Sequence, residues 1–230
     1  MLDEAGFAII SPFVPEPLTD ALISAIPSPQ LFNSFIRGTH RVFAIRRLLH
    51  TVPELKPLLS ETGIAELARN YFASDVKVIR SIYFNKPEGA NWVVPWHQDL
   101  TVNVIAQHHT PGFSGWAEKE GQITAKAPVS LLNRILTVRI HLDDCDADNG
   151  ALKVIPGSHL QGEYRPEQAG DDFTHRAATC AVPKGGIMLM RPLLLHSSTR
   201  SNGRQRRVIH LELCSDSLPL PLQWSEAVSL

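Results

Sequence analysis

The sequence predicts a mainly β protein with flanking helices, built on a double-stranded β-helix core of the jelly-roll, cupin-like kind. Three observations favour this fold: short β-branched runs recur from residue 76 onward, Gly, Pro and Asn-Gly signals separate them, and no helical pattern intervenes. A parallel α/β sheet would need such helices between its strands. We therefore expect one domain over 1–230, with a helix-rich part over about 1–75 and a jelly-roll core over about 76–215.

The N-terminal part is predicted to combine one strand with several helices. Residues 7–10 form a short apolar run that is typical of a strand. Residues 15–26 carry apolar side chains at helical spacing, and Pro17 is tolerated in the first turn of such a helix. Further helices are predicted over 53–60 and 62–72.

Five strands are predicted in the rest of the chain. They are rich in β-branched residues and bounded by turn residues, and they span 76–84, 135–142, 152–155, 187–190 and 208–214. The mouth of a barrel built from such strands is a suitable place for a metal ion or a small ligand.

Net charge is silent about the class of partner. The chain has 230 residues, 43% of them hydrophobic, with 22 basic and 23 acidic side chains and a formal net charge of −1. Such a balance provides no global field that would favour nucleic acid or an anionic membrane over a small molecule. The partners expected from the chain as a whole are a small-molecule substrate, no nucleic acid and no membrane, and the expected state is a monomer or homodimer.

The cysteines and the N-terminus indicate the compartment. Cys145, Cys180 and Cys214 are widely spaced, which fits neither a disulfide framework nor a Cys-X-X-Cys zinc site and is typical of free thiols in a reducing compartment. The first residues do not resemble a signal peptide, and no apolar stretch approaches membrane-spanning length. A soluble, cytoplasmic protein is expected.

A His-X-Asp triplet provides the first candidate site. Residues i and i+2 of an extended strand face the same side, so His97 and Asp99 would project together while Gln98 faces away. Such triplets arise often by chance, and a surface His-Asp pair is the simpler explanation. Trp92 and Trp96 flank the triplet and could supply apolar walls.

A distant histidine could complete a metal site. His196 ends the apolar run 188–195, where a buried imidazole needs a partner, and a core histidine that donates to a backbone carbonyl is the alternative. Two histidines and one carboxylate form the ligand set that leaves half of an octahedral iron(II) ion open. If the three residues converge, oxygen-activating chemistry is expected.

A basic turn over 200–207 precedes the last predicted strand. An arginine that opens this strand could form a bidentate ion pair with the distal carboxylate of a dicarboxylic cosubstrate, because its planar fork matches a carboxylate. A solvated basic turn is the alternative.

Four ordered blocks of sequence resemble one family. They are Phe84-Asn85-Lys86-Pro87, then Trp96-His97-Gln98-Asp99, then 142–159 with Asn149-Gly150 and Pro156-Gly157-Ser158-His159, and finally His196-Ser197-Ser198 through Arg206-Arg207-Val208-Ile209. In their order and spacing they resemble the phytanoyl-CoA dioxygenase family of iron(II)- and 2-oxoglutarate-dependent oxygenases. The resemblance implies that His97, Asp99 and His196 bind iron. It also implies that the strand-opening arginine binds the far carboxylate of 2-oxoglutarate.

Two arginines compete for this last role. The family pattern matches Arg206, which would place the alternate residues Val208, His210 and Glu212 inward and leave Ile209, Leu211 and Leu213 to pack beneath the helices. Choosing Arg207 would invert the strand, since a slip by one residue exchanges its faces. Arg206 is preferred, with Arg207 as the alternative.

The resemblance suggests supporting roles for two further residues. Ser198 resembles a serine near the cosubstrate carboxylate, although a hydroxyl that caps a turn is the simpler explanation. Arg139 stands where relatives tend to carry tryptophan, and it could contact 2-oxoglutarate or an acidic substrate, or form a buried ion pair. It shares its strand face with Thr137 and His141. The Asn149-Gly150 turn is interpreted as structural, and His159 as no ligand.

The activity implied by the resemblance is hydroxylation of an aliphatic C–H bond. The cofactors would be iron(II), 2-oxoglutarate and O2, and the products would include succinate and CO2. Asp99 favours hydroxylation, desaturation or ring closure over halogenation, because related halogenases replace this carboxylate. A metal-binding cupin-like protein or isomerase without 2-oxoglutarate is the alternative, and a nucleic-acid demethylase has support only from the basic turn.

Substrate selection is expected in the long segment between Leu100 and Asn133. A connection of this length is usually a lid or binding element, although a surface excursion that stabilises a dimer is equally plausible. It contains amide, imidazole and aromatic side chains, namely Gln107, His108, His109, Phe113 and Trp116. Neither His108 nor His109 is assigned to iron, because adjacent strand residues point in opposite directions.

Overall fold

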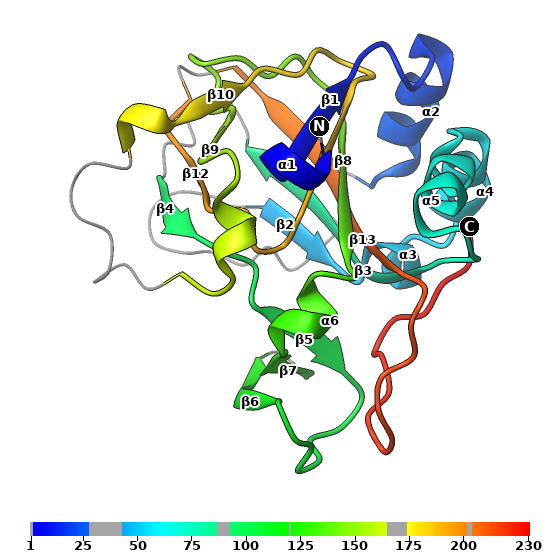
Figure 1. Cartoon of the computed structure of the whole chain (residues 1–230). Helices are drawn as coiled ribbons and strands as arrows, with labels where there is room; N and C mark the ends of the chain where they lie inside the picture. Colours follow the sequence, from blue (N-terminus) through cyan, green and yellow to red (C-terminus); the bar gives the residue numbers. More distant parts are fainter. Residues whose placement is uncertain (1, 28–42, 87–92, 120, 165–173, 202–203) are drawn as a thin grey trace.

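Two antiparallel sheets with a shared interior form the centre of the molecule (Figure 1). The computed structural model describes residues 2–27, 43–86, 93–119, 121–164, 174–201 and 204–230. The major sheet has the strand order β1-β11-β8-β13-β3-β2, and the minor sheet has the order β10-β9-β12-β4. The major sheet consists of β1 (Phe7–Ile10), β2 (Phe43–Arg46), β3 (Lys77–Lys86), β8 (Leu136–His141), β11 (Ile187–Met190) and β13 (Arg206–Cys214). The minor sheet consists of β4 (Val94–His97), β9 (Leu152–Val154), β10 (Ala178–Cys180) and β12 (His196–Ser198).

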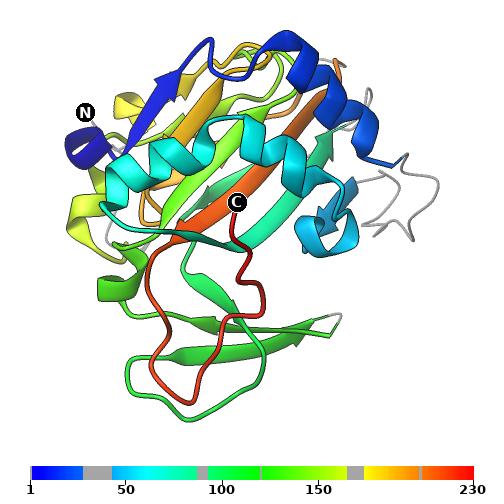
Figure 2. The same cartoon turned by 90° about the vertical axis from the view of Figure 1, so that its right-hand side faces the viewer.

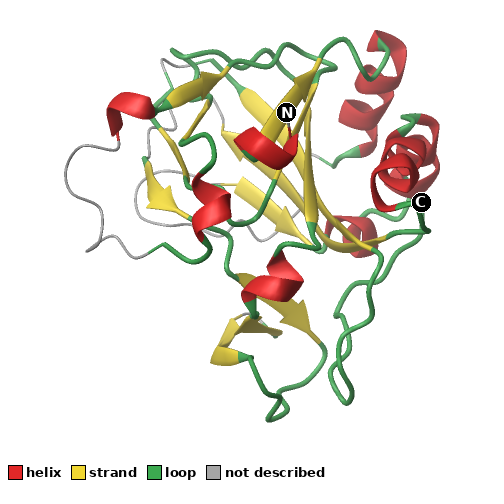
Figure 3. Cartoon of the chain, in the orientation of Figure 1, coloured by secondary structure: helices red, strands yellow, loops and turns green. Residues whose placement is uncertain are grey.

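Helices cover the outer face of the major sheet (Figure 2), and Figure 3 distinguishes them from the strands by colour. The helices are α1 (Leu2–Ala5), α2 (Glu16–Ala25), α3 (Leu48–Thr51), α4 (Leu55–Glu61), α5 (Ile64–Phe72) and α6 (Val129–Leu132), with short 3₁₀ helices η2 (Ser158–Gln161) and η4 (Thr174–Arg176). Fully buried Leu22, Leu55 and Ile64 of the covering helices pack in one cluster with Ile140 and Ile209 of the sheet. This packing fixes the position of the major sheet.

The last long strand has two different faces. Ile209, Leu211 and Leu213 of β13 belong to the core beneath the helices. The alternating residues His210 and Glu212 are also buried, at 5% and 3% exposure, but they belong to the polar interior between the sheets. The alternation predicted for this strand is confirmed.

The segment from Leu100 to Asn133 folds into a sheet of its own. Its strands are β5 (Thr101–Val104), β6 (Ser114–Lys119) and β7 (Gln122–Lys126), in the order β5-β7-β6. Val102 and Val104 of β5 pack in a second core cluster with Trp224 of the C-terminal segment. Main-chain pairing and apolar contacts thus give this segment regular structure, and its expected role in substrate selection stays a prediction.

The elements predicted from the sequence are present, and their ends differ by a few residues. The short strands β2, β10 and β12 were not predicted, and neither was the third sheet, whereas β4 lies where a strand was expected at His97. In the described part of the chain no helix is long and apolar enough to cross a membrane.

Candidate metal centre

His97, Asp99 and His196 converge at the edge between β4 and β12. One ligand atom from each of the three lies within 4.8 Å of the other two, and they form the candidate metal group found among the described residues. His97 ends β4 and is the register partner of His196 on β12, so antiparallel pairing brings their rings to a centroid distance of 4.1 Å. Asp99 Oδ2 lies 3.8 Å from His196 Nε2. The site is thus assembled by pairing between segments about a hundred residues apart.

Asp99 lies beyond the end of β4, which corrects the expectation that it shares a strand with His97. Its backbone N–H donates to Pro192 O at 2.9 Å. The neighbouring Gln98 faces away from the triad, as predicted, and its amide donates to Leu193 O at 2.6 Å and Gly162 O at 2.9 Å. Gln98 Oε1 also accepts from the Tyr164 N–H at 2.8 Å. These bonds, rather than strand geometry, fix the backbone of the segment that carries Asp99.

Backbone carbonyls orient both imidazole rings. Nδ1 of His97 lies 2.8 Å from Pro95 O, and Nδ1 of His196 lies 2.8 Å from Leu194 O. A carbonyl oxygen only accepts, so Nδ1 carries the hydrogen and Nε2 keeps its lone pair. Such contacts orient histidine ligands in metal sites. The carbonyl contact expected for a core histidine is thus present, and it leaves Nε2 available for a metal.

The charges of the triad suit a divalent cation. Burial lowers the pKa of His196 to about 4, although Asp99 opposes this shift. Burial alone would raise the pKa of Asp99, but His196, His210 and His97 outweigh burial, and the pKa falls below its usual value. At neutral pH the Asp99 carboxylate is ionised and the His196 ring is neutral, as metal ligation requires.

The two candidate arginines differ in their partners. Arg207 forms a bidentate ion pair with Asp143, with Nε 2.8 Å from Oδ2 and Nη2 2.6 Å from Oδ1. Arg206 is 8% exposed, and its guanidinium donates to Gly150 O and approaches Cys145 Sγ. Arg207 already has a carboxylate, whereas Arg206 has none among the described residues.

Lys86 and Gly150 form the surroundings of Arg206. The Lys86 ammonium is buried and donates to Thr199 O at 2.9 Å. Burial, and then the charge of Arg206, lowers the pKa of Lys86 to about 8. Gly150 has a φ of +70°, and a Cβ there would lie 2.9 Å from Thr199 O, so glycine is required for this close approach. The Asn149-Gly150 turn is structural, as predicted.

Arg139 lies in the same interior but has a histidine as its partner. Its Nη1 lies 3.1 Å from His210 Nδ1. The buried ion pair here is instead Arg80–Glu212, at 2.7 Å, between cross-strand neighbours of β3 and β13. Lys86 and His141 were given no role from the sequence, and this ion pair was not predicted. Polar residues at alternate positions of predicted strands were the available signal.

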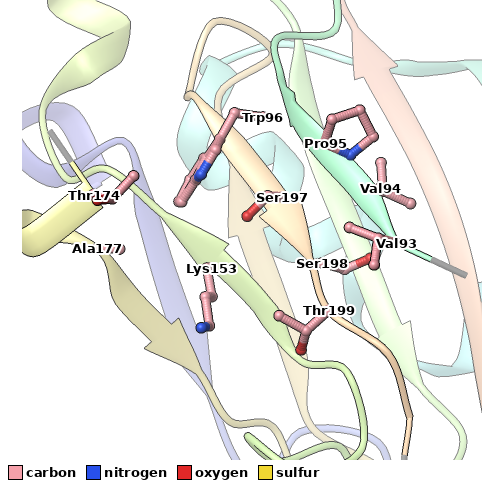
Figure 4. Close-up of a pocket in the computed structure, with 10 residues that line it drawn as sticks. All are labelled: Val93, Val94, Pro95, Trp96, Lys153, Thr174, Ala177, Ser197, Ser198 and Thr199. Atoms are coloured by element: carbon pink, nitrogen blue, oxygen red, sulfur yellow. The ribbon is translucent and has the colours of Figure 1, made fainter. Parts of the chain in front are cut away.

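Two predicted site residues, Trp96 and Ser198, border a hollow that is lined by residues of β4 and β12. Trp96 lines a hollow of about 250 Å³ together with Lys153 and Ser197 (Figure 4), and none of the three triad residues lines that hollow. Adjacent strand residues point to opposite faces, which explains why Trp96 turns away when His97 faces the triad. Ser198 is buried and borders the same hollow, after a register irregularity that follows His196. Trp92 lies outside the described residues.

Three histidines stay apart from the triad. His108 and His109 are exposed, and His159 contacts Asp3 O at 3.1 Å. Phe113 and Trp116 pack partly buried against the second core cluster. We expected none of these three histidines to bind iron, and none of them belongs to the group of ligand atoms formed by the triad.

Comparison with known proteins adds relatives of two kinds. The family model for phytanoyl-CoA dioxygenase (PhyH) matches residues 2–209. L-Proline trans-4-hydroxylase from Streptomyces griseoviridis is 28% identical over 151 residues, which cover 54% of this chain and 48% of that protein. The chain thus spans about half the length of this curated relative.

Solved structures share the fold at low identity. EctD from S. alaskensis, solved with 2-oxoglutarate and 5-hydroxyectoine, superposes with a TM-score of 0.70 and 19% identity, covering 95% of this chain and 76% of EctD. The non-heme alpha ketoglutarate dependent epimerase SnoN from nogalamycin biosynthesis superposes with a TM-score of 0.68 and 15% identity, covering 94% of this chain and 79% of SnoN. Since the family model matches most of its length, this chain belongs to the phytanoyl-CoA dioxygenase family of iron(II)- and 2-oxoglutarate-dependent oxygenases.

Proposed function

We propose that this protein hydroxylates an aliphatic C–H bond of a small organic substrate, consuming O2 and 2-oxoglutarate and releasing succinate and CO2. The observation that carries the proposal is the convergence of His97, Asp99 and His196 within 4.8 Å. One carboxylate and two imidazoles on one side of an ion leave the opposite positions open. A purely structural metal site would be closed by protein ligands.

In this proposal the three side chains hold iron(II). His97 and His196 offer Nε2, because their Nδ1 hydrogens are engaged by backbone carbonyls. Asp99 offers an ionised carboxylate on a segment that the side-chain bonds of its neighbour Gln98 anchor. When bound, iron supplies the activation of O2, and the protein fixes the ligands and orients one C–H bond.

Arg206 is proposed to bind the distal carboxylate of 2-oxoglutarate. Support comes from its burial, from the absence of a carboxylate partner among the described residues, and from the engagement of Arg207 by Asp143. A buried guanidinium without a carboxylate is costly, so an anionic ligand would stabilise it. Ser198 is proposed to assist, and Arg139 to contribute to carboxylate binding as argued below.

Hydroxylation is proposed over other outcomes on two grounds. The Asp99 carboxylate occupies a position at which halogenation would need an open site. The sequence relative named above is a hydroxylase of a free amino acid, which favours a small, polar substrate. The epimerase SnoN has the same fold, so epimerisation is the second candidate.

Iron-dependent turnover of 2-oxoglutarate tests this function. We expect purified protein with iron(II), O2 and 2-oxoglutarate to form succinate, and Arg206→Ala to raise the KM for 2-oxoglutarate at least tenfold. Arg207→Ala is the matched control, with a KM near that of the wild type. No iron-dependent succinate in the wild type would contradict the proposal and favour a metal-binding barrel that does not use 2-oxoglutarate.

A further inference from the structure

The inner face of β8 carries an unusual number of buried polar atoms without partners. In the described part of the chain six buried side-chain atoms lack a hydrogen-bond partner, and four of them belong to Thr137, Arg139 and His141. These residues alternate along β8 and therefore share one face. Buried polar groups in folded proteins are almost always bonded, so this face is built for a polar ligand.

A chain of contacts fixes Arg139 within this face. Arginine only donates, so Nδ1 of His210 accepts the contact from Arg139 Nη1 at 3.1 Å, and the hydrogen of His210 is on Nε2. That Nε2 lies 3.5 Å from Glu212 Oε1, which also accepts from Arg80 at 2.7 Å. Glu212 is thus paired with Arg80, and Arg139 has no carboxylate partner among the described residues.

The charge of Arg139 interacts both with the triad and with Arg206. Burial, and then Arg206, lowers the pKa of Arg139 to about 10, while Asp99 opposes the shift. The charge of Arg139 also contributes to the lowered pKa of His196. Only 8% of Arg139 is exposed, so its charge is poorly solvated in the protein alone. An anion placed here would remove this cost.

We propose that Arg139 binds a carboxylate beside the triad, separate from the carboxylate assigned to Arg206. The inference rests on the proposed function. The planar fork of Arg139 suits bidentate contact with a carboxylate, and His210 and Glu212 act as positioning residues that hold the fork in place. The carboxylate belongs either to the keto acid end of 2-oxoglutarate or to a carboxylic acid substrate such as an amino acid.

Two binding measurements distinguish these sources. The first is anaerobic titration calorimetry of the iron(II)-loaded protein with 2-oxoglutarate. The second is the same titration with L-proline and with acetate after 2-oxoglutarate is saturating. The variants are Arg139→Gln, which removes the charge, and Arg139→Lys, which keeps the charge but loses the fork. Arg134→Gln is the matched control, since Arg134 is largely exposed and paired with Asp216.

The results show whether the carboxylate belongs to 2-oxoglutarate or to the substrate. A loss of about ten- to a hundredfold in 2-oxoglutarate affinity in Arg139→Gln, partly restored in Arg139→Lys, assigns it to the cosubstrate. Unchanged 2-oxoglutarate affinity with loss of L-proline or acetate binding assigns it to the substrate. One result overturns the inference while the proposed function stands. In that case Arg139→Gln leaves the 2-oxoglutarate affinity unchanged, and L-proline and acetate bind equally well to the variant and the wild type, or to neither. Wild-type protein that binds no 2-oxoglutarate overturns both.

The proposed role of Glu212 in positioning Arg139 can be tested separately. Glu212→Gln is expected to lower the affinity for the same carboxylate several-fold. Combining it with Arg139→Gln should lower the affinity no further than Arg139→Gln alone. A role in stability alone would not produce this non-additivity. The melting temperature of ligand-free Arg139→Gln is expected to equal or exceed that of the wild type, because the variant removes a buried charge without a carboxylate partner. A lower melting temperature together with unchanged ligand affinity would show a structural role and refute the proposal.

Discussion

Replacing Glu212 by glutamine should leave the Arg80 guanidinium as a buried cation without its carboxylate. The two groups are 2.7 Å apart, and their side chains are 10% and 3% exposed. Removing one partner of a buried ion pair typically costs about 3–5 kcal/mol. Arg80 Nη2 keeps two acceptors, Thr101 O at 2.7 Å and Asn103 Oδ1 at 2.9 Å, so we expect the lower end of that range.

Urea denaturation and thermal melting measure this cost. A loss of about 3 kcal/mol corresponds to a fall of roughly 6–12 °C in melting temperature for a domain of this size. Glu118→Gln, at an exposed position of β6, is the control and should change stability by less than about 0.5 kcal/mol. The double variant Arg80→Met, Glu212→Gln should be more stable than the sum of the single effects predicts. A loss below about 1 kcal/mol in Glu212→Gln would refute the assignment of a tight buried pair.

Three further predictions concern single residues. Arg207→Met should cost about 1 kcal/mol in urea denaturation, because it breaks a half-buried pair with Asp143, and should leave iron affinity unchanged; a loss of iron binding would contradict this. Gln98→Ala should weaken iron affinity about ten- to a hundredfold in equilibrium dialysis, since Gln98 anchors the segment that carries Asp99; unchanged affinity would count against that role. Burial, with Arg139 and Arg206, holds the pKa of His141 well below 6.5, so its contribution to stability is present above pH 6.5 and is lost as the pH falls below it. The urea midpoint should therefore fall between pH 7.5 and 5.5, and the fall should be smaller in His141→Gln; an equal fall in both proteins would disprove the assignment.

The strand β13 shows what the sequence can predict. Its apolar residues at alternate positions must face the helices, because a slip by one residue would bury the wrong set. Ile209, Leu211 and Leu213 do so, and Arg206 accordingly shares a strand face with His210 and Glu212. The sequence predicts that the polar residues of β8 and β13 alternate with apolar ones, but it does not predict which polar side chains contact each other. Arg80 pairs with Glu212 because the β3–β13 register sets them opposite each other, and Arg139 contacts His210 instead of a carboxylate.

Other features depend on contacts far apart in the chain. Asp99 is placed by Pro192, and its position could not be derived from the strand spacing of the triplet. The strands β5, β6 and β7 have mixed polar patterns, and their sheet is completed by the C-terminal segment, through a bridge between Val104 and Trp224. Trp96 directly precedes His97 in β4, so strand alternation by itself places the two side chains on opposite faces.

The most direct test is the visible spectrum of the anaerobic protein with iron(II) and 2-oxoglutarate. We expect a charge-transfer band, because the triad leaves positions at which the keto acid can chelate iron. The band should be absent in His97→Ala, and at limiting 2-oxoglutarate it should be weaker in Arg206→Ala and unchanged in Arg207→Ala. A wild-type protein that shows no band would contradict the assignment of His97, Asp99 and His196 as an iron site for 2-oxoglutarate.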